Sequence, residues 1–239
     1  MGGDMTYRYI SEDSFEFTFA FYIDCVNGNP GAIASDQFAI LGFFNATTKQ
    51  YIDKVEIERG KPQRVSKLNY ACVTPPTSAC VDRYEYTFRK RVDVGKDGII
   101  VAFQRCCRNY TITNLVDPGG TGMTLIATIP SENVVRINSN PVFKDSPPNF
   151  LCNNAPLVFD HSATDVDGDS LVYDLYLPFK GADANSPRPS QPSNPDYDNE
   201  TYTSAYGISN LMGGSEKLKI DRRTGRLTVV PDKIGQYVV

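Results

Sequence analysis

Phe15-Glu16-Phe17-Thr18-Phe19-Ala20-Phe21-Tyr22-Ile23 is the stretch that decides the fold of this 239-residue chain. Apolar side chains occupy every second position. Successive side chains of a β-strand point to opposite faces, so this alternation predicts a strand with one strongly apolar face. Similar patterns predict strands at residues 5–10, 84–88, 99–103 and 123–129, and residues 38–44, apolar on both faces, are typical of a central strand.

Turn residues separate the predicted strands, and helix signals are almost absent. Asn27-Gly28-Asn29-Pro30-Gly31 and Asp117-Pro118-Gly119-Gly120 are examples of this punctuation. Many short strands divided in this way predict an all-β protein made of two tandem β-sandwich, immunoglobulin-like domains. A boundary at Asn138-Ser139-Asn140-Pro141 would divide the chain into a disulfide-stapled domain, residues 1–138, and a second domain, residues 139–239.

The second domain has its own predicted strands, at residues 156–160, 170–178, 217–220, 226–230 and 235–239. A long polar loop, residues 179–214, interrupts them, and we expect it to lie on the surface with little regular structure. Its Tyr197, Tyr202 and Tyr206 could pin the loop onto the sandwich or form a binding loop for sugars. The chain ends within a predicted strand, so we expect the second domain to be truncated at its C-terminus.

Three carboxylates at alternate positions crowd the turn Asp165-Val166-Asp167-Gly168-Asp169. Such a cluster is costly unless a cation lies among the charges, and Ca²⁺ accepts six to eight oxygen ligands. We therefore expect Asp165, Asp167 and Asp169 to bind Ca²⁺, with Asp160 completing the shell and Asp174 as a further candidate. The turn is not an EF-hand, because position 12 is Tyr176 instead of Glu. The alternative is an ordinary turn with solvated carboxylates.

Six cysteines predict disulfides rather than a metal site: Cys25, Cys72, Cys80, Cys106, Cys107 and Cys152. No Cys-x-x-Cys pair occurs, and the chain has a single histidine, so a Cys₂His₂ zinc site is excluded. Disulfides imply an oxidising, extracytoplasmic setting. A Cys72–Cys80 bridge would close a short loop. Cys106 and Cys107 would point to opposite faces of a strand and have different partners, Cys25 for one, and Cys152 for the other unless it pairs beyond the chain.

Charge and motif content argue against several classes of function. The net charge of −4 gives no footprint for nucleic acid, and no apolar stretch is long enough to insert into a membrane. The sequence has no phosphate-binding or dinucleotide-binding glycine motif. A catalytic triad would have to use His161, the single histidine, which lies beside Asp160 and the acidic turn, where a surface role is expected. We therefore expect no enzyme.

Two resemblances add to these inferences. The acidic turn running into Ser170-Leu171-Val172-Tyr173, together with the hairpin signal Ile220-Asp221-Arg222-Arg223-Thr224-Gly225, resembles the cadherin-like immunoglobulin-fold repeats of bacterial surface proteins. This resemblance covers roughly the last 100 residues. It implies that the second domain is a cadherin-like sandwich, from which the loop at residues 179–214 is a departure.

A second resemblance spans nearly the whole chain. It rests on residues 2–7, 21–25 and 138–143, on Gln104-Arg105-Cys106-Cys107-Arg108-Asn109, on residues 160–165 and on a Pro- and Tyr-rich insertion ending in Gly213-Gly214. These elements resemble large secreted Bacteroidota proteins that carry PKD-like repeats and a gliding-motility-associated C-terminal segment. The resemblance implies export by type IX secretion and an extracellular, cell-surface location.

The sequence thus predicts a non-catalytic structural module of a large surface adhesin or filament subunit, rigidified by Ca²⁺ and disulfides. Its partners would be other copies of the chain or neighbouring β modules, because sheet edges are templates for strand addition. The alternative is a carbohydrate- or protein-binding accessory module of a secreted enzyme, with surface glycans as partners.

Overall fold

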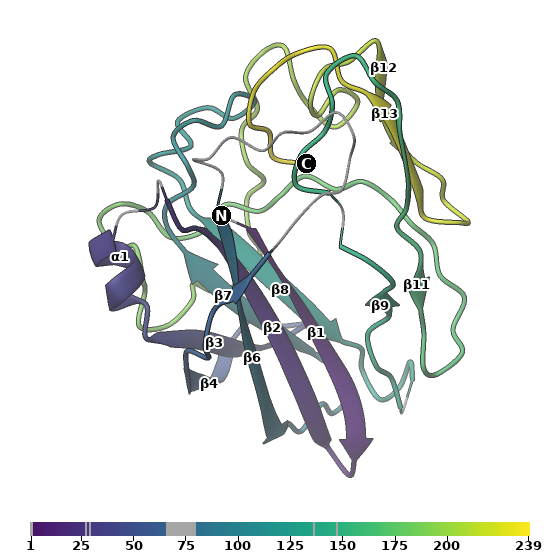
Figure 1. Ribbon diagram of the computed structural model, residues 1–239. Helices are drawn as coiled ribbons and strands as arrows, with labels where there is room; N and C mark the ends of the chain where they lie inside the picture. Colours follow the sequence, from purple (N-terminus) through teal and green to yellow (C-terminus); the bar gives the residue numbers. More distant parts are fainter. Residues whose placement is uncertain (1, 27, 29, 66–79, 136, 147) are drawn as a thin grey trace.

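The first half of the chain is a sandwich of two antiparallel four-stranded sheets. The computed structural model describes residues 2–26, 28, 30–65, 80–135, 137–146 and 148–239. Sheet A has the order β1-β2-β6-β5 and sheet B the order β4-β3-β7-β8 (Figure 1). The strands of sheet A are β1 (Gly2–Ser11), β2 (Ser14–Asp24), β5 (Gln63–Arg64) and β6 (Val81–Arg91). Those of sheet B are β3 (Phe38–Asn45), β4 (Tyr51–Glu58), β7 (Ile99–Arg105) and β8 (Met123–Ile129).

The alternating phenylalanines of β2 form the centre of the core. Phe17 and Phe19 are fully buried, and β2 lies between β1 and β6 in sheet A. Phe19 meets Phe103 of sheet B with ring centroids 4.4 Å apart, and Phe17 meets Phe43 at 5.5 Å. Aromatic side chains bury large areas and gain further from such edge and tilted contacts. The alternating phenylalanines that the sequence pattern identifies are therefore the side chains through which sheet A packs on sheet B.

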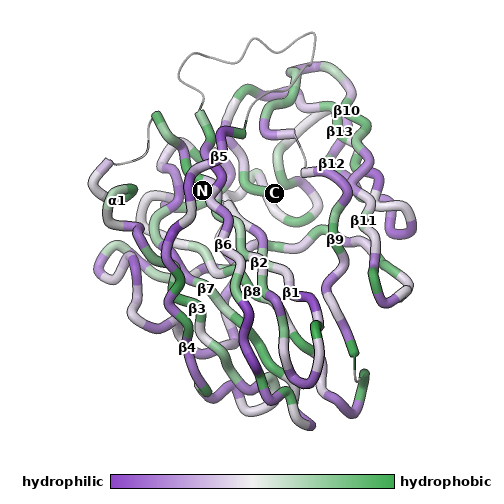
Figure 2. Tube along the Cα trace, turned by 60° about the horizontal axis from the view of Figure 1, so that its bottom comes forward, coloured by the Kyte–Doolittle hydropathy of each residue, from purple (hydrophilic) through white to green (hydrophobic). Residues whose placement is uncertain are grey.

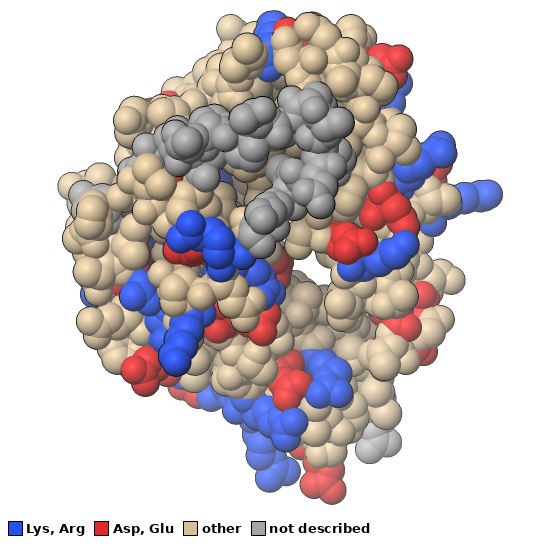
Figure 3. All heavy atoms as spheres, viewed as in Figure 1, with Lys and Arg blue, Asp and Glu red and all other residues tan. Residues whose placement is uncertain are grey.

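The outward face of sheet A is polar and carries both signs of charge. Glu16 lies between Arg8 and Arg89, with ion pairs of 2.7 and 2.8 Å. Figure 3 shows Lys, Arg, Asp and Glu side chains intermixed on this side of the molecule. Exposed pairs of this kind contribute little to stability, about 0–1 kcal/mol each. The outward face of sheet A is therefore a solvated surface on which neither positive nor negative charge predominates.

The second half has less regular structure. It contains a three-stranded sheet of order β10-β13-β12 and a two-stranded ribbon of β9 and β11. The bounds are β9 (Val142–Phe143), β10 (Leu157–Asp160), β11 (Ala163–Thr164), β12 (Glu216–Ile220) and β13 (Arg226–Val230). Leu227 and Val229 bury one face of the small sheet. The views place this half beside and above the sandwich (Figures 1 and 2).

The all-β class is confirmed, a two-sheet sandwich is present in the first half of the chain, and two predicted strands are wrong. Residues 170–178 show alternating burial but join no ladder. At residues 235–239 a single parallel bridge links Gln236 to Ile112, instead of a strand in the second sheet. A six-residue helix, α1 (Pro30–Ser35), follows the first turn signal. In the part of the chain that the structure describes, no helix is both long and apolar enough to cross a membrane.

The outer edge of β1 is covered by the segment that connects the two halves. The Asn140 side-chain oxygen accepts from the Tyr7 N–H at 2.9 Å, and the Asn140 N–H donates to the Tyr7 carbonyl at 2.8 Å. The Ser139 hydroxyl accepts from the Tyr9 N–H at 3.2 Å. Uncovered strand edges invite pairing with other chains. The predicted boundary at residues 138–141 is thus part of the sandwich's own edge.

Candidate functional site

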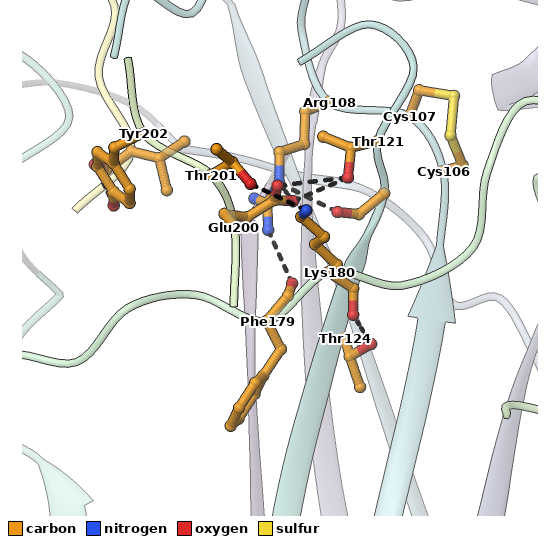
Figure 4. Close-up of polar contacts among 12 residues, drawn as sticks. Cys106, Cys107, Arg108, Thr121, Thr124, Phe179, Lys180, Glu200, Thr201 and Tyr202 are labelled. Carbon is orange, nitrogen blue, oxygen red and sulfur yellow. Dashed lines mark hydrogen bonds and ion pairs between the residues drawn. A yellow bond between two sulfur atoms is a disulfide. The ribbon is translucent and has the colours of Figure 1, made fainter. Parts of the chain in front are cut away.

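The most highly constrained polar region lies where β7 ends, at residues 104–109, called the hub segment below. Cys106 and Cys107 form a disulfide with each other. The expectation that they have different partners assumed that they alternate along a strand, but β7 ends at Arg105, so the alternation stops before them. Cys106 is buried and Cys107 is partly exposed. In the sequence the bridge lies between two buried arginines, Arg105 and Arg108, and Figure 4 shows the bridge together with Arg108.

Arg108 binds a carboxylate from the long loop. Its Nε lies 2.9 Å from Glu200 Oε1, with side chains only 4% and 0% exposed. The guanidinium also donates to the carbonyls of Gly122 and Phe179, and the Thr121 hydroxyl donates to Glu200. Figure 4 shows these groups converging from separate parts of the chain. A buried charge pair with additional hydrogen bonds fixes geometry strongly, because removing one partner leaves an uncompensated charge.

Arg105 makes the corresponding contact on the other side of the bridge. Its guanidinium donates to Asp36, just beyond α1, with Nε 2.9 Å from Oδ1 and Nη2 2.9 Å from Oδ2. Nη1 donates to the Pro187 carbonyl at 2.6 Å and to the Cys106 carbonyl. The Cys106 N–H donates to the same Pro187 carbonyl at 2.9 Å. The residues on either side of the disulfide thus form two buried ion pairs with distant segments, Arg105 with Asp36 and Arg108 with Glu200.

Gln104 supplies a third attachment. Its amide oxygen accepts from the Ser193 N–H at 2.9 Å, and its amide nitrogen donates to the Ser193 hydroxyl at 2.9 Å and to Thr124 at 3.0 Å. The Thr124 hydroxyl in turn donates to the Lys180 carbonyl. Residues of the short hub segment therefore hold Ser193, Pro187 and Glu200, all within the long loop.

The loop region held by the hub, residues 178–202, is called the overlay segment, because it covers the outer face of sheet B. Phe44, Ile100 and Ala102 are buried on that face, with Tyr197 packed against them. Lys180 donates its N–H to Asp198, and Glu200 donates its N–H to Pro178, so the segment also pairs with itself. The central strands β3 and β7 are therefore apolar on their outer side as well, because the overlay segment covers that side.

Backbone contact between the overlay segment and the start of β8 is very close. A Cβ placed on Gly122 would lie 1.8 Å from the Gly181 carbonyl oxygen, and one on Gly181 would lie 2.0 Å from the Thr124 hydroxyl. No side chain fits at such separations. Glycine at both positions is what allows the segment to approach β8 closely enough for the polar contacts to form.

A second polar anchor lies beyond the hub at Asn114, which is fully buried. Its amide nitrogen donates to the carbonyls of Leu211 and Val238, at 2.6 and 2.7 Å, and its amide oxygen accepts from the Val238 N–H. The Asn114 carbonyl accepts from the Thr203 N–H. One asparagine therefore joins the first half, the end of the long loop and the last residues of the chain.

The three tyrosines proposed as a binding loop lie in three different settings. The Tyr197 ring packs on sheet B, its hydroxyl donates to the Ser193 carbonyl, and burial raises its pKa. The Tyr202 hydroxyl donates to the Val238 carbonyl, and burial raises the pKa of this phenol to about 12. Tyr206 packs against Tyr237 with centroids 5.8 Å apart. Tyr197 therefore packs on sheet B, whereas Tyr202 and Tyr206 contact adjacent residues, Val238 and Tyr237, near the end of the chain.

The four acidic residues proposed for Ca²⁺ are only partly brought together. Asp165 accepts the N–H groups of Asp167 and Asp169 and so closes its own turn. Asp167 accepts the Ser139 N–H at 2.6 Å. Asp160 faces Lys144 at 2.8 Å, and this hydrogen-bonded ammonium lowers its pKa to about 2. Because Asp160 and Asp167 already have other partners, these carboxylates do not form a pre-assembled metal shell.

Among the described residues, a different group, Cys25, Cys80 and Asp82, has its potential ligand atoms within 4.8 Å of one another. Cys25 and Cys80 form a disulfide with Cα atoms 5.3 Å apart, so neither offers a thiolate. The strand register explains this pairing, because Asp24 opposes Val81 between β2 and β6. The expected Cys72–Cys80 bridge and the expected pairing of Cys25 with the vicinal cysteines are therefore wrong. Cys152 is also disulfide-bonded, and Cys72 lies outside the described residues.

Sequence reasoning missed Asp36, Asn114 and Glu200, and it assigned no contacts to Gln104, Arg105 and Arg108. The Gln-Arg-Cys-Cys-Arg-Asn motif drew attention to the right segment, but nothing in its spacing indicates the partners. Asp36, Ser193 and Glu200 are ordinary polar residues in loops, and their contacts span 69–92 positions of sequence. No protein-family model, curated protein or solved structure matches the chain.

Proposed function

We propose that this chain is a non-catalytic structural module of a larger extracellular adhesin or filament subunit, exported by type IX secretion. The observation that carries the proposal is the use of its buried polar residues. Arg105, Arg108, Gln104 and Asn114 are committed to contacts between distant segments. This use of polar side chains suits a structural module that must keep its shape, because their hydrogen-bonding groups already have partners within the fold.

The disulfides support an extracellular location. Cys25–Cys80 and Cys106–Cys107 are both formed, and Cys152 is bonded as well. Disulfides persist in secreted and surface proteins and are rare in reducing compartments. The immunoglobulin-like nature of the sandwiches and the cadherin-like nature of the second half belong to the same proposal, with the β10-β13-β12 sheet as the part that would be cadherin-like.

The partners in this proposal are copies of the same chain or adjoining β modules. Carbohydrate binding, as an accessory module of a secreted enzyme, is the competing function. It is disfavoured because Tyr197 packs on sheet B and the hydroxyls of Tyr197 and Tyr202 already donate to backbone carbonyls of the protein. Ca²⁺ belongs to the proposal as a weakly bound ion at Asp165, Asp167 and Asp169, where Asp167 would offer Oδ1 while its Oδ2 accepts the Ser139 N–H.

Sedimentation analysis of the purified chain tests the structural proposal, from micromolar to near-millimolar concentration, with Ca²⁺ or with a chelator. Association that rises with concentration supports a self-assembling module, and a strict monomer at the highest concentration counts against it. A glycan array is the second arm. Sugar binding that disappears in Tyr202→Ala/Tyr206→Ala, with unchanged melting temperature, would instead establish the accessory-module function.

A further inference from the structure

The Cys106–Cys107 bridge is placed where it adds little to global stability. A disulfide stabilises a fold mainly by restricting the unfolded chain, and this effect grows with the length of the loop it closes. Cys25–Cys80 spans 55 residues. Closing a loop of that length restricts the unfolded chain substantially. Cys106 and Cys107 are adjacent, so their bridge closes no intervening chain.

The effect of the vicinal bridge is therefore local, and its surroundings show what it controls. The Cys106 N–H donates to the Pro187 carbonyl at 2.9 Å. On one side Arg105 reaches Asp36 and Pro187, and on the other Arg108 reaches Glu200. The bridge limits rotation of the backbone between these two arginines. The contacts of the overlay segment at Pro187 and at Glu200 depend on that backbone.

We propose that Cys106–Cys107 is a thiol–disulfide exchange site that operates in the folded protein, and that its reduction releases the overlay segment from sheet B. The co-reactant is a low-molecular-weight thiol. Cys107 is partly exposed, whereas Cys106 is 3% exposed, so attack takes place at the Cys107 sulfur. This inference is independent of the adhesin proposal, because it concerns how the chain responds to reductant and not what it binds.

The exchange proceeds in two balanced steps. A thiolate attacks Cys107 Sγ, the bond between the two cysteine sulfurs breaks, and its electron pair leaves on Cys106 Sγ, which takes up a proton. A second thiolate attacks the external sulfur of the mixed disulfide and expels Cys107 as a thiolate, which is also protonated. The cysteine pair gains two electrons and two protons, and two external thiols become one external disulfide.

The consequence of reduction is selective loosening. The sandwich core between Phe17, Phe19, Phe43 and Phe103 does not depend on the bridge. The overlay segment depends on the positions of Arg105 and Arg108. Its release would expose Phe44 and Ile100 on the outer face of sheet B. A reducing environment would therefore convert a covered apolar face into an accessible one without unfolding the protein.

The test treats the whole chain with dithiothreitol under native conditions, then labels free thiols with an alkylating reagent and maps them by peptide mass spectrometry. Hydrogen exchange of the same samples is followed in parallel. The expected result is labelling of Cys106 and Cys107 while β2 and β7 stay protected. Amide exchange at Cys106, Thr124 and Ser193, whose N–H groups donate across the contact between the overlay segment and the sandwich, should rise about tenfold or more, because local opening of the overlay is less costly than global unfolding.

Two paired variants keep the test decisive. Cys106→Ser/Cys107→Ser should reproduce the faster exchange without reductant, at a nearly unchanged unfolding midpoint. Cys25→Ser/Cys80→Ser, the matched control, should lower the midpoint of the whole molecule instead. The proposal is overturned if Cys106 and Cys107 become labelled only when the core also opens. It is equally overturned if they are labelled, or replaced, while exchange in the overlay segment stays unchanged.

Discussion

Arg108 and Glu200 are 92 residues apart in the sequence, yet they form an ion pair of 2.9 Å that is almost completely excluded from solvent. The pair joins the end of sheet B to the long loop and is surrounded by the carbonyls of Gly122 and Phe179. Closure of the overlay segment over the sandwich therefore depends on two charges that must be desolvated together.

Loss of one charge should destabilise the protein strongly. Arg108→Met leaves the Glu200 carboxylate buried without its cation, so the free energy of unfolding should fall by about 3–5 kcal/mol in urea denaturation. The double variant Arg108→Met/Glu200→Leu should recover much of this loss, because two apolar groups need no partner. Arg8→Met is the matched control, since the Arg8–Glu16 pair is exposed and should cost no more than about 1 kcal/mol. Equal losses for Arg8→Met and Arg108→Met would contradict this account.

A single added methyl group should displace the overlay segment. Gly122→Ala places a Cβ 1.8 Å from the Gly181 carbonyl oxygen, and both partners are backbone. To relieve this clash, the two backbone segments must move apart. The free energy of unfolding should fall by about 1–3 kcal/mol, as at other overpacked sites. Gly207→Ala is the control, because nothing lies within 4 Å of its added Cβ. Hydrogen exchange at Thr124, whose N–H donates to the Phe179 carbonyl, should increase in the first variant and not in the second.

Stability should decline at high pH. Burial raises the pKa of Tyr7 and of Tyr86 to about 12. An unfolded tyrosine has a pKa near 10, so the neutral phenols favour the folded state. Their contribution is complete below about pH 10 and is lost as the pH rises towards 12. Denaturation midpoints from pH 8 to 12 should therefore fall, and Tyr7→Phe/Tyr86→Phe should weaken that fall. An unchanged pH profile in the double variant would refute the assignment.

Ca²⁺ should raise the melting temperature modestly. A site with the weak affinity of extracellular modules, about 10⁻⁴–10⁻³ M, gains about 1.5–2.7 kcal/mol at 10 mM ion if only the folded state binds. Asp165→Asn/Asp169→Asn should abolish the difference between Ca²⁺ and chelator. Asp145→Asn is a control outside the turn. Equal melting temperatures of the unchanged protein with ion and with chelator would remove Ca²⁺ from the proposal.

The strands of the sandwich were predictable because they are encoded locally. Phe15, Phe17, Phe19 and Phe21 repeat every two residues, and β2 buries all four. The same reasoning failed at residues 170–178, where the alternation is real but no neighbouring strand supplies hydrogen bonds. An alternating pattern of apolar residues indicates which side of an extended segment is buried. It does not indicate whether a neighbouring strand is present to form backbone hydrogen bonds with that segment.

The hub could not be predicted beyond its central motif, because its contacts are long-range. Nothing near Glu200 indicates a partner at Arg108, and nothing near Pro187 indicates that its carbonyl accepts from two residues of another segment. The cysteine pairing failed for a related reason. Cys25 and Cys80 are set side by side by the register of β2 and β6, and register becomes known only when the sheet is known.

The cover on β1 has a practical consequence for anyone who divides this protein for expression. A clone stopping at residue 138 would omit Ser139 and Asn140, which occupy the hydrogen-bonding edge beside Tyr7 and Tyr9. It would also omit Tyr197, which shields Phe44. The first half expressed alone should therefore precipitate or oligomerise. A soluble protein should require the chain to continue at least through the overlay segment.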